Sequence, residues 1–530
     1  MLHSSFESIL HTNVVPSDAD CQRICDLLVG PRKEAADLSA EISRMKKLLD
    51  ELTEKRDALD NFIAAHSALI SPARRLPEDI VRDIFVACLP SNRNALILSD
   101  EAPLLLCQIC SAWRQLALLT PRLWASVHIV VPNPPVLNVL AEMVTHWLNR
   151  SGALPLSISV VFSRTWKIGQ TNLPLLMPLI GFSRRWQDIE LTVNHVTCTA
   201  LETLSPDDVP LLKSINIRGI QRRIPGGVGI FHDGIDNVES LAFLNTASLR
   251  SVTVAQGSDL HKFPLPWAQL RGLVVENEGI QYAHAVDILR QCLFLEHCVL
   301  QISPSLPPPD QRRIPLPHLR HLSISVGPVR VGTPNAVAFF NLIVAPNLRS
   351  LAYSQLSSVL GPFPFASLLA KGSLECFSLS LSDLPHNTVW ADCLAAMPLV
   401  HKFRLAINGR PHLIGRGSPH EDVVTQLTPS LDGSRPILCP LLQSIELTGL
   451  NETVSDQALL RLVQARTGAR PRGVTQLSRV TFAFQRDMEV DILPSLEQEI
   501  SLGLVVSLQY KHLFKDSYSA AQGTEREIVP

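Results

Sequence analysis

The amino-acid sequence predicts an α/β protein in which a helical N-terminal region precedes a long array of short strands. Three observations predict this class: one stretch of helical periodicity without Gly or Pro, two further apolar helices, and a short apolar pattern that returns along most of the chain. The 530 residues exceed what one hydrophobic core usually organises. Apolar residues make up 46% of the chain and charged residues 18%, so a large core can form.

Charge and cysteine content exclude several classes of protein. The 47 basic and 49 acidic residues give a net charge of -2. This balance argues against the broad basic surface that is typical of a nucleic-acid-binding protein. The 11 cysteines are scattered and Met1–Leu10 lacks a secretory signal, so we expect an intracellular protein of the cytoplasm or nucleus. The longest apolar runs, such as Leu173–Phe182, contain prolines and are shorter than the roughly 18 residues of a membrane span. We therefore expect neither a nucleic-acid nor a membrane partner.

The first predicted element is a coiled-coil helix over residues 34–70, preceded by a flexible N-terminus at residues 1–33. Between Glu34 and His66 there is no Gly or Pro, and Arg56 alone interrupts an apolar heptad seam. The seam residues are Leu38, Ile42, Met45, Leu49, Leu52, Leu59 and Ile63. Two interpretations stay open with even weight: a homodimer or partner helix through residues 34–66, or a helix folded back on its own domain. Ser71-Pro72 ends the helix, because a residue before proline avoids the α region.

The second predicted element is a three-helix module over residues 72–125. Leu76–Leu89 places a proline at a helix start and acidic residues in its first turn. After an insert at Pro90–Ala102, Leu104–Ala117 forms a helix that is apolar nearly all round, and Thr120–Trp124 begins a short third one. About fifty residues cannot hide this much apolar surface internally, so part of it should meet either the neighbouring domain or a second protein, which implies a protein-docking face.

These residues resemble the F-box. The resemblance rests on Leu-Pro-x-x-Ile at 76–80 with Ile84-Phe85, on Ile109-Cys110-Ser111-x-Trp113-Arg114-x-Leu116-Ala117, and on Thr120-Pro121-x-Leu123-Trp124. The wider arrangement is similar to an F-box-like family of mushroom-forming fungi. The resemblance implies docking on the Skp-type adaptor of a cullin-RING ubiquitin ligase. The implied adaptor-binding residues are Leu76, Pro77, Ile80, Val81, Ile84, Phe85, Ile109 and Trp113. The alternative is that Trp113 and Trp124 only fasten this module to the rest of the chain.

The third predicted element is a solenoid over residues 136–506, followed by a frayed tail at 507–530. A six-residue pattern recurs, mostly at intervals of about 21 to 29 residues. Its first, fourth and sixth residues are apolar, and the others are spacers. The pattern occurs at Trp186/Ile189/Leu191, Leu212/Ile215/Ile217, Leu249/Val252/Val254, Leu270/Leu273/Val275, Leu295/Cys298/Leu300, Leu319/Leu322/Ile324, Leu348/Leu351/Tyr353, Leu374/Phe377/Leu379, Val400/Phe403/Leu405, Leu442/Ile445/Leu447 and Leu477/Val480/Phe482. It resembles degenerate leucine-rich repeats, in which the last two anchors lie on a strand and point into the core. Each strand should therefore stack on the next.

Three insertions interrupt this pattern, at Gly219–Asp236, Ser303–Pro317 and Asn408–Pro436. Loops on one edge of a solenoid often bind partners, so these segments are candidates for recognising a substrate. The plainer interpretation, which we favour for any single loop, is a surface insertion without a role, because loop length costs little stability.

Motifs of catalysis or cofactor binding are absent from the order of residues. Cys107-x-x-Cys110 has metal-like spacing without a second pair, so we expect two packed thiols. Cys292, His297 and Cys298 lie around one strand and do not converge on an ion, and core packing explains Cys298. Gly226–Gly229 lacks the rest of a dinucleotide fingerprint. We expect no cofactor, no metal and no catalytic residue.

The sequence thus favours a non-enzymatic substrate receptor: the F-box docks the Skp-type adaptor, and the repeat array binds a protein target of unknown identity. A second hypothesis is a scaffold outside any ligase that oligomerises through its N-terminal helix. A hydrolase built on solenoid loops is a distant third, because no motif supports it.

Overall fold

The computed structural model divides the chain into two compact units, residues 1–84 and 85–530. The boundary passes through one helix, and each unit is described by itself. The structure describes residues 4–132, 136–162, 171–223, 230–233, 238–255, 260–276, 279–303, 312–327, 337–355, 363–369, 373–381, 390–407, 419–430, 436–450, 454–468 and 470–510.

The first unit is dominated by one helix, α1 (Asp18–Leu69). It begins at Asp18, so the expectation of a flexible segment through residue 33 is wrong. The side chain of Ser17 accepts a hydrogen bond from the backbone N of Asp20, and acidic residues occupy the first turn. This cap lets the helix begin before residue 34, where the sequence predicted its start. Pro31 lies inside the helix. The helix ends just before Ser71-Pro72, as expected.

A short 3-10 turn, η1 (Pro72–Arg75), joins α1 to α2 (Glu78–Ala87). Pro77 precedes the first turn of α2, where Glu78 and Asp79 face the positive end of the helix. Glu78 also pairs with Arg82 one turn on, at 3.2 Å. Local signals in the sequence therefore account for where α2 starts.

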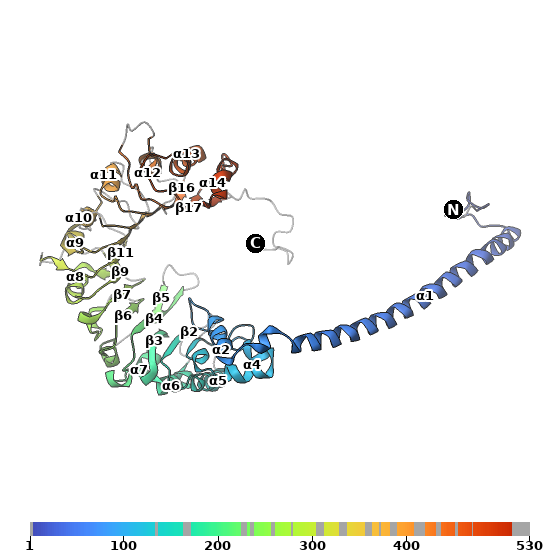
Figure 1. Ribbon diagram of the computed structural model, residues 1–530, viewed down its shortest axis with the longest axis horizontal. Helices are drawn as coiled ribbons and strands as arrows, with labels where there is room; N and C mark the ends of the chain where they lie inside the picture. The colour runs from blue at the N-terminus through green and yellow to red at the C-terminus, as the bar shows by residue number, and fades with distance from the viewer. Residues whose placement is uncertain are drawn as a thin grey trace. The chain divides into compact units, whose positions relative to one another are not determined.

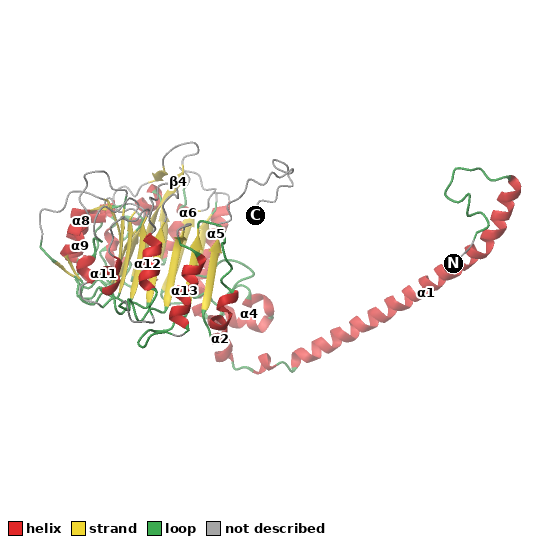
Figure 2. Ribbon diagram, turned by 90° about the horizontal axis from the view of Figure 1, so that it is seen from above, coloured by secondary structure: helices red, strands yellow, loops and turns green. Residues whose placement is uncertain are grey.

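The second unit is built on an open, mostly parallel sheet. Figures 1 and 2 show its strands side by side, with helices on the outer side. Within the described residues the strands form one 16-stranded sheet and a separate pair, β10 with β12. The strands are β1 (Ser126–Val131), β2 (Leu156–Phe162), β3 (Trp186–Val193), β4 (Ser214–Arg223), β5 (Ile230–Asp233), β6 (Ser251–Val254), β7 (Gly272–Val275), β8 (Ile280–Gln281), β9 (His297–Ser303), β10 (Ile314–Pro315), β11 (His321–Val326), β12 (Ile343–Val344), β13 (Ser350–Gln355), β14 (Cys376–Leu381), β15 (Lys402–Ile407), β16 (Ser444–Leu450), β17 (Arg479–Phe484) and β18 (Val505–Tyr510). The chain is therefore of the α/β class.

The predicted core residues of the strands meet one another in register. Leu322 lies opposite Cys298 on one side and Leu351 on the other, and all three are buried. The same column runs through Ile189, Ile215, Val252, Leu273, Cys298, Leu322, Leu351, Phe377, Phe403, Ile445, Val480 and Val506. Each fully buried Leu or Ile contributes about 1.5 to 3 kcal/mol, so stability comes from stacking rather than from single strands. The predicted strand positions are confirmed.

Seven of the described strands lie outside the predicted pattern, and three of them, β1, β2 and β18, lengthen the sheet at its ends. β1 and β2 extend the sheet at its N-terminal end, so it begins at Ser126 rather than at residue 136. β18 pairs with β17 and ends at Tyr510, beyond the expected limit of 506. The ring of Tyr510 stacks on that of Phe484, with centroids 4.3 Å apart, at the last strand pair. The rest of the expected tail, 511–530, lies outside the described residues.

In the second unit the helices that follow β1 lie behind the strands (Figure 1), and all of them except α14 bury apolar residues. They are α5 (Leu137–Arg150), α6 (Leu173–Gly181), α7 (His195–Leu201), α8 (Tyr282–Gln291), α9 (Val337–Leu342), α10 (Ala366–Leu369), α11 (Trp390–Ala395), α12 (Pro419–Leu427), α13 (Asp456–Thr467) and α14 (Glu497–Ser501). The expected return helix, capped by Ser455 and closed by Gly468, is confirmed as α13.

The expected helix over Leu104–Ala117 is broken into α3 (Leu106–Ile109) and α4 (Ser111–Leu118). Cys110 between them is fully extended, and its Sγ accepts a hydrogen bond from the backbone N of Trp113 at 3.4 Å. The Nε of Arg114 donates to the carbonyl O of Cys107 at 2.7 Å. These two bonds satisfy groups that a continuous helix would otherwise have paired.

The insert between the module's helices closes the first edge of the sheet. The backbone N of His128 in β1 donates to the carbonyl O of Ala95 at 2.8 Å, and Leu96 forms a parallel bridge with His128. Arg93 forms an ion pair with Glu101 across the insert. The insert therefore protects β1 from pairing with another chain.

The segments expected as insertions carry partial structure. β4 continues through Arg223 and pairs antiparallel with β5, so part of Gly219–Asp236 is a hairpin rather than a loop. Residues 408–418 and 431–435 of the third insertion, residues 304–311 of the second, and Gly226–Gly229 lie outside the described residues. α12 forms within the third insertion.

Two buried arginines fasten the C-terminal strands and helices. Arg466 on α13 is buried and donates to the carbonyl oxygens of Leu427, Cys439 and Leu438 at 2.7, 3.1 and 2.7 Å. Burial lowers the pKa of its guanidinium to about 10. It therefore remains charged at neutral pH and is solvated by the backbone of the neighbouring turns.

The second buried arginine, Arg486, binds a buried carboxylate. It donates to Asp456 at 2.6 Å, and Asp456 also accepts from the backbone N of Glu489 and Val490. Burial raises the pKa of Asp456, but the hydrogen bonds from Arg486, Val490 and Glu489 outweigh it, and the pKa is lowered overall.

Candidate protein-docking faces

Helix α2 presents an apolar face to solvent in the first unit. Ile80 and Ile84 lie one turn apart and are 45% and 42% exposed, and Leu76 just before the helix is 39% exposed. Pro77 is exposed as well. A short amphipathic helix normally buries such residues. Four of the sequence-predicted docking residues are therefore accessible to a partner.

A neighbouring face of α2 is turned inward. Val81 and Phe85 are only 5% and 0% exposed, although the sequence interpretation placed both on the docking surface. Both faces of α2 are apolar, and the pattern alone does not tell which is covered. In this conformation neither side chain has surface to offer a partner.

The start of the second unit carries the other predicted docking residues. The rings of Phe85 and Trp113 meet edge-on with centroids 4.9 Å apart, and Trp113 is half-buried. Ile109 is exposed. Leu105, Leu118 and Leu119 are also exposed apolar residues of this segment. Sequence reasoning did not single them out, although the all-round apolar pattern of Leu104–Ala117 was the available signal.

Trp124 fastens the helical segment to the sheet. It is fully buried, its Nε1 donates to the carbonyl O of Ala117 at 2.9 Å, and its ring packs edge-on against Trp147 of α5. Arg150 lies over the same ring, 4.9 Å from its centroid. The alternative interpretation, in which this residue is a fastening, therefore holds for Trp124.

The two cysteines of this segment, Cys107 and Cys110, lie in different environments. Cys107 is half-buried and Cys110 is exposed, so the expectation of two packed thiols is wrong for Cys110. Its Sγ instead caps α4, as described above. Among the described residues no group of His, Cys, Asp and Glu side chains is placed to hold a metal ion.

The strand face opposite the helices is lined by small polar side chains at its centre. In β11, β13 and β14 most residues that alternate with the buried ones are small: Ser323, Ser325, Ala352, Ser354, Ser378 and Ser380. The first position of each strand on the same face carries His321, Ser350 and Cys376. Charged pairs flank this central part: Arg218 with Glu190 at 3.4 Å and Arg404 with Glu446 at 3.1 Å. Small side chains allow another protein to approach the sheet closely, while the charged pairs remain accessible on either side.

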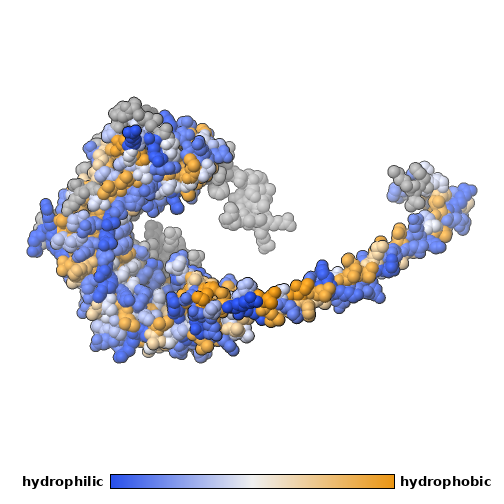
Figure 3. Space-filling model, viewed as in Figure 1, coloured by the Kyte–Doolittle hydropathy of each residue, from blue (hydrophilic) through white to orange (hydrophobic). Residues whose placement is uncertain are grey.

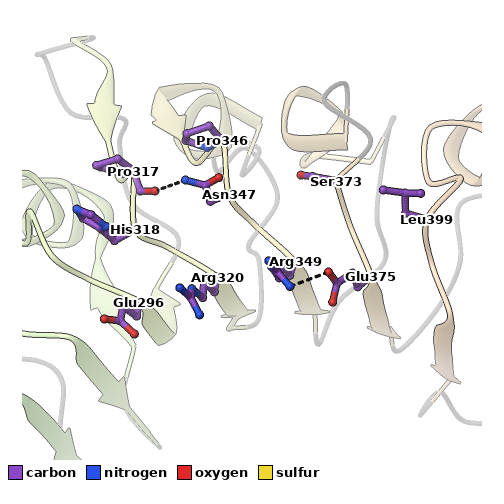
Figure 4. Close-up of a pocket in the computed structure, with 10 residues that line it drawn as sticks. All are labelled: Glu296, Pro317, His318, Arg320, Pro346, Asn347, Arg349, Ser373, Glu375 and Leu399. Carbon is purple, nitrogen blue, oxygen red and sulfur yellow. Dashed lines mark hydrogen bonds and ion pairs between the residues drawn. The ribbon is translucent and has the colours of Figure 1, made fainter.

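A half-open groove of about 450 Å³ lies where the central strands begin (Figure 4). Arg349 pairs with Glu375 at 3.1 Å, and the Nδ2 of Asn347 donates to the carbonyl O of Pro317 at 2.7 Å. The remaining lining residues are Glu296, His318, Arg320, Pro346, Ser373 and Leu399. Mixed charge and a shallow opening suit a protein surface better than a small apolar ligand.

Histidine and cysteine side chains lie beside this groove. The rings of His297 and His321 stack with centroids 4.5 Å apart, and burial lowers the pKa of both. The Sγ of Cys376 lies 3.8 Å from the Nε2 of His401, but burial raises the pKa of that thiol. A nucleophilic cysteine needs the opposite shift, toward thiolate.

Cys298 is a core residue, as expected, and Cys292 is buried as well. Cys298 is completely buried, and burial raises the pKa of its thiol. Burial raises the pKa of Cys292 to about 12. His297 projects from β9 on the other face of the sheet, so the three side chains do not converge.

No family model matches the chain, and no curated protein matches it. Among the described residues no helix combines the length and the apolar composition that crossing a membrane requires. The candidate docking faces rest on the geometry described above.

Proposed function

We propose that this chain is the substrate-recognition subunit of a cullin-RING ubiquitin ligase of the SCF type. Residues 72–125 act as an F-box that docks the Skp-type adaptor, and the sheet unit acts as a degenerate leucine-rich-repeat solenoid that binds a target protein. The observation that carries the proposal is the exposed apolar face of α2, made by Leu76, Ile80 and Ile84. Contiguous exposed apolar residues commonly mark a protein-interaction site.

The proposed contribution to ubiquitin transfer is proximity. The chain holds the target, and other subunits carry out the bond chemistry. The strand face with its central serines and flanking charged pairs is the proposed target surface, because its small side chains allow close packing and its charges give specificity. The proposal places the protein in the cytoplasm or nucleus and assigns it no cofactor and no catalytic residue.

Adaptor capture tests the proposal directly. The purified chain, immobilised, should retain a Skp-type adaptor, and Ile80→Asp with Ile84→Asp should abolish this because charges would enter a desolvated contact. Both residues are exposed, so the double variant should fold normally. Its thermal transition should match that of the unmodified chain.

A matched control carries the same chemical change elsewhere. Leu211 and Leu293 are exposed leucines of the sheet unit, and Leu211→Asp with Leu293→Asp should leave capture unchanged. Capture that survives Ile80→Asp with Ile84→Asp, or that is lost equally in the control, would remove the F-box proposal.

The second candidate is a scaffold outside any ligase that oligomerises through α1. The exposed apolar seam of that helix favours it. The two candidates differ in one observable, because a scaffold of this kind has no affinity for the adaptor, whatever its oligomeric state.

A further inference from the structure

The apolar seam of α1 has no cover within its own unit. In the described part of that unit its residues are between 54% and 63% exposed: Leu38, Ile42, Met45, Leu49, Leu52, Leu59 and Ile63. Figure 3 shows apolar residues gathered along one side of α1, with charged residues on the other. A helix this long with such a seam has the surface of half a coiled coil.

The identities of the seam residues specify the number of strands. The spacing places Ile42, Leu49 and Ile63 at a positions of the heptad, and d positions are mainly leucine. β-Branched residues at a with leucine at d favour two parallel helices over three or four. Upstream, Pro31 falls on a d position, so regular packing starts after it, near Ala35.

A single charged residue interrupts the seam. Arg56 occupies an a position and is held outward by Asp57 at 2.6 Å and by Asp60 at 3.9 Å on the same helix. A lone polar residue at an a position lowers stability but fixes register and favours dimers, because only there does its charged end reach water. The seam therefore contains its own register marker.

The residues that flank the seam are complementary to a second copy of the same helix. In a parallel pair each g residue faces the e residue five positions on in the other helix. Glu41 at g then faces Lys46 of the second copy, and Lys55 at g faces Asp60 of the second copy. Arg44 already binds Glu41 within the helix at 2.6 Å, so Lys46 of the second copy joins an ordered carboxylate.

We infer that α1 binds a second copy of this chain as a parallel, in-register, two-stranded coiled coil over residues 35–66. The inference rests on the exposed seam, the distribution of a and d residues, and the opposite charges at g and e. It is independent of adaptor binding. It makes each assembly bivalent, because two sheet units are joined through one coiled coil.

Sedimentation of the full-length chain at micromolar concentration tests the stoichiometry. The expected mass is twice 58.4 kDa. Ile42→Glu with Leu49→Glu puts charges into two a layers and should raise the dissociation constant by about 100-fold or more. Ala40→Glu with Ser43→Glu adds the same charges on the outer face of the helix and should leave the dimer intact.

The thermal transition of the sheet unit should be the same in all of these variants, because the changes lie outside it. A monomeric unmodified chain, a mass of three or more chains, or a dimer that survives Ile42→Glu with Leu49→Glu would overturn the inference. Adaptor capture by the monomeric variant is measured separately, so failure of the dimer and failure of the proposed function are distinguishable.

Disulfide trapping tests the orientation. Ile42→Cys and Ile63→Cys are made singly in a background of Cys21→Ser and Cys25→Ser, which removes the exposed native thiols of α1. Each should crosslink to the same position of the second copy, as identified by mass spectrometry of the joined peptides. Crosslinks that form only between positions 42 and 63, in a mixture of the two variants, would contradict the parallel arrangement.

Discussion

Leucines in α1 and leucines in the sheet ladder have opposite environments. Leu49 of α1 is 63% exposed, whereas Leu351 of β13 is 0% exposed. Both belong to regular apolar patterns, one with the heptad period and one with the alternation of a strand. The ladder finds its neighbours within the same chain, because each repeat supplies the next strand, while the seam of α1 has no equivalent in its own unit. Periodicity predicts an element, and burial depends on whether the chain supplies the second surface.

The largest expected effect comes from placing a charge in the ladder. Leu351→Asp should lower the free energy of unfolding by more than about 5 kcal/mol and abolish the cooperative transition, because the carboxylate has no partner in a stacked core. The same change in α1, Leu49→Asp, should alter the free energy of unfolding of the sheet unit by less than about 0.5 kcal/mol. Calorimetry of both variants measures the contrast, and an unaltered transition in Leu351→Asp would refute the stacked core.

The next effect concerns the buried carboxylate at the C-terminal end of the ladder. Its pKa is lowered in the folded state, so the pair Asp456–Arg486 stabilises the fold above the unfolded value of about 3.9 and loses this contribution as pH falls through the folded pKa. Asp456→Asn should cost about 3 to 5 kcal/mol at neutral pH and flatten the acid limb of the stability curve. Urea unfolding between neutral and acidic pH checks this, and an unchanged acid limb would contradict it.

A somewhat smaller effect is expected at the second buried arginine. Arg466→Ala removes the donors to three buried carbonyl groups and should cost about 3 kcal/mol. Arg461 on the same helix is exposed, so Arg461→Ala provides the control and should cost less than about 0.5 kcal/mol. Equal denaturant midpoints for the two variants would show that the carbonyl contacts are not stabilising.

The smallest effect concerns the stacked histidines. Burial lowers the pKa of His297 and His321, so below the unfolded value of about 6.5 the unfolded chain takes up more protons than the folded chain. Stability should therefore fall as pH drops below that value. His297→Gln with His321→Gln should make stability depend less on pH below that value. Thermal unfolding at closely spaced pH values measures this dependence. If the variant shows the same dependence as the unmodified chain, the two histidines are not its source.

The ladder could be predicted from the sequence because one face of each strand is buried, which forces alternation and register together. Two of the missed strands lack the first anchor of the pattern: Pro155 precedes β2 and Gly503 precedes β18 at that position. β1 does carry the pattern, as Trp124/Val127/Ile129, but Trp124 had been assigned to the helical module.

The exposed apolar face of α2 could be predicted only in part. Its apolar character follows from the sequence, but the division into covered and exposed faces depends on tertiary packing, so Val81 and Phe85 were placed on the wrong side. The burial of Arg466 also depends on a distant partner, the carbonyl O of Leu427. Local propensity contains no information about such contacts.

Hydrogen exchange of the full-length chain, with and without a Skp-type adaptor, tests most directly the claim that α2 is a docking face. The account predicts that the adaptor slows exchange in peptides covering Leu76–Ile84, while the strands of the ladder exchange as before. Binding that leaves Leu76–Ile84 unprotected, or an adaptor that does not bind at all, would contradict it.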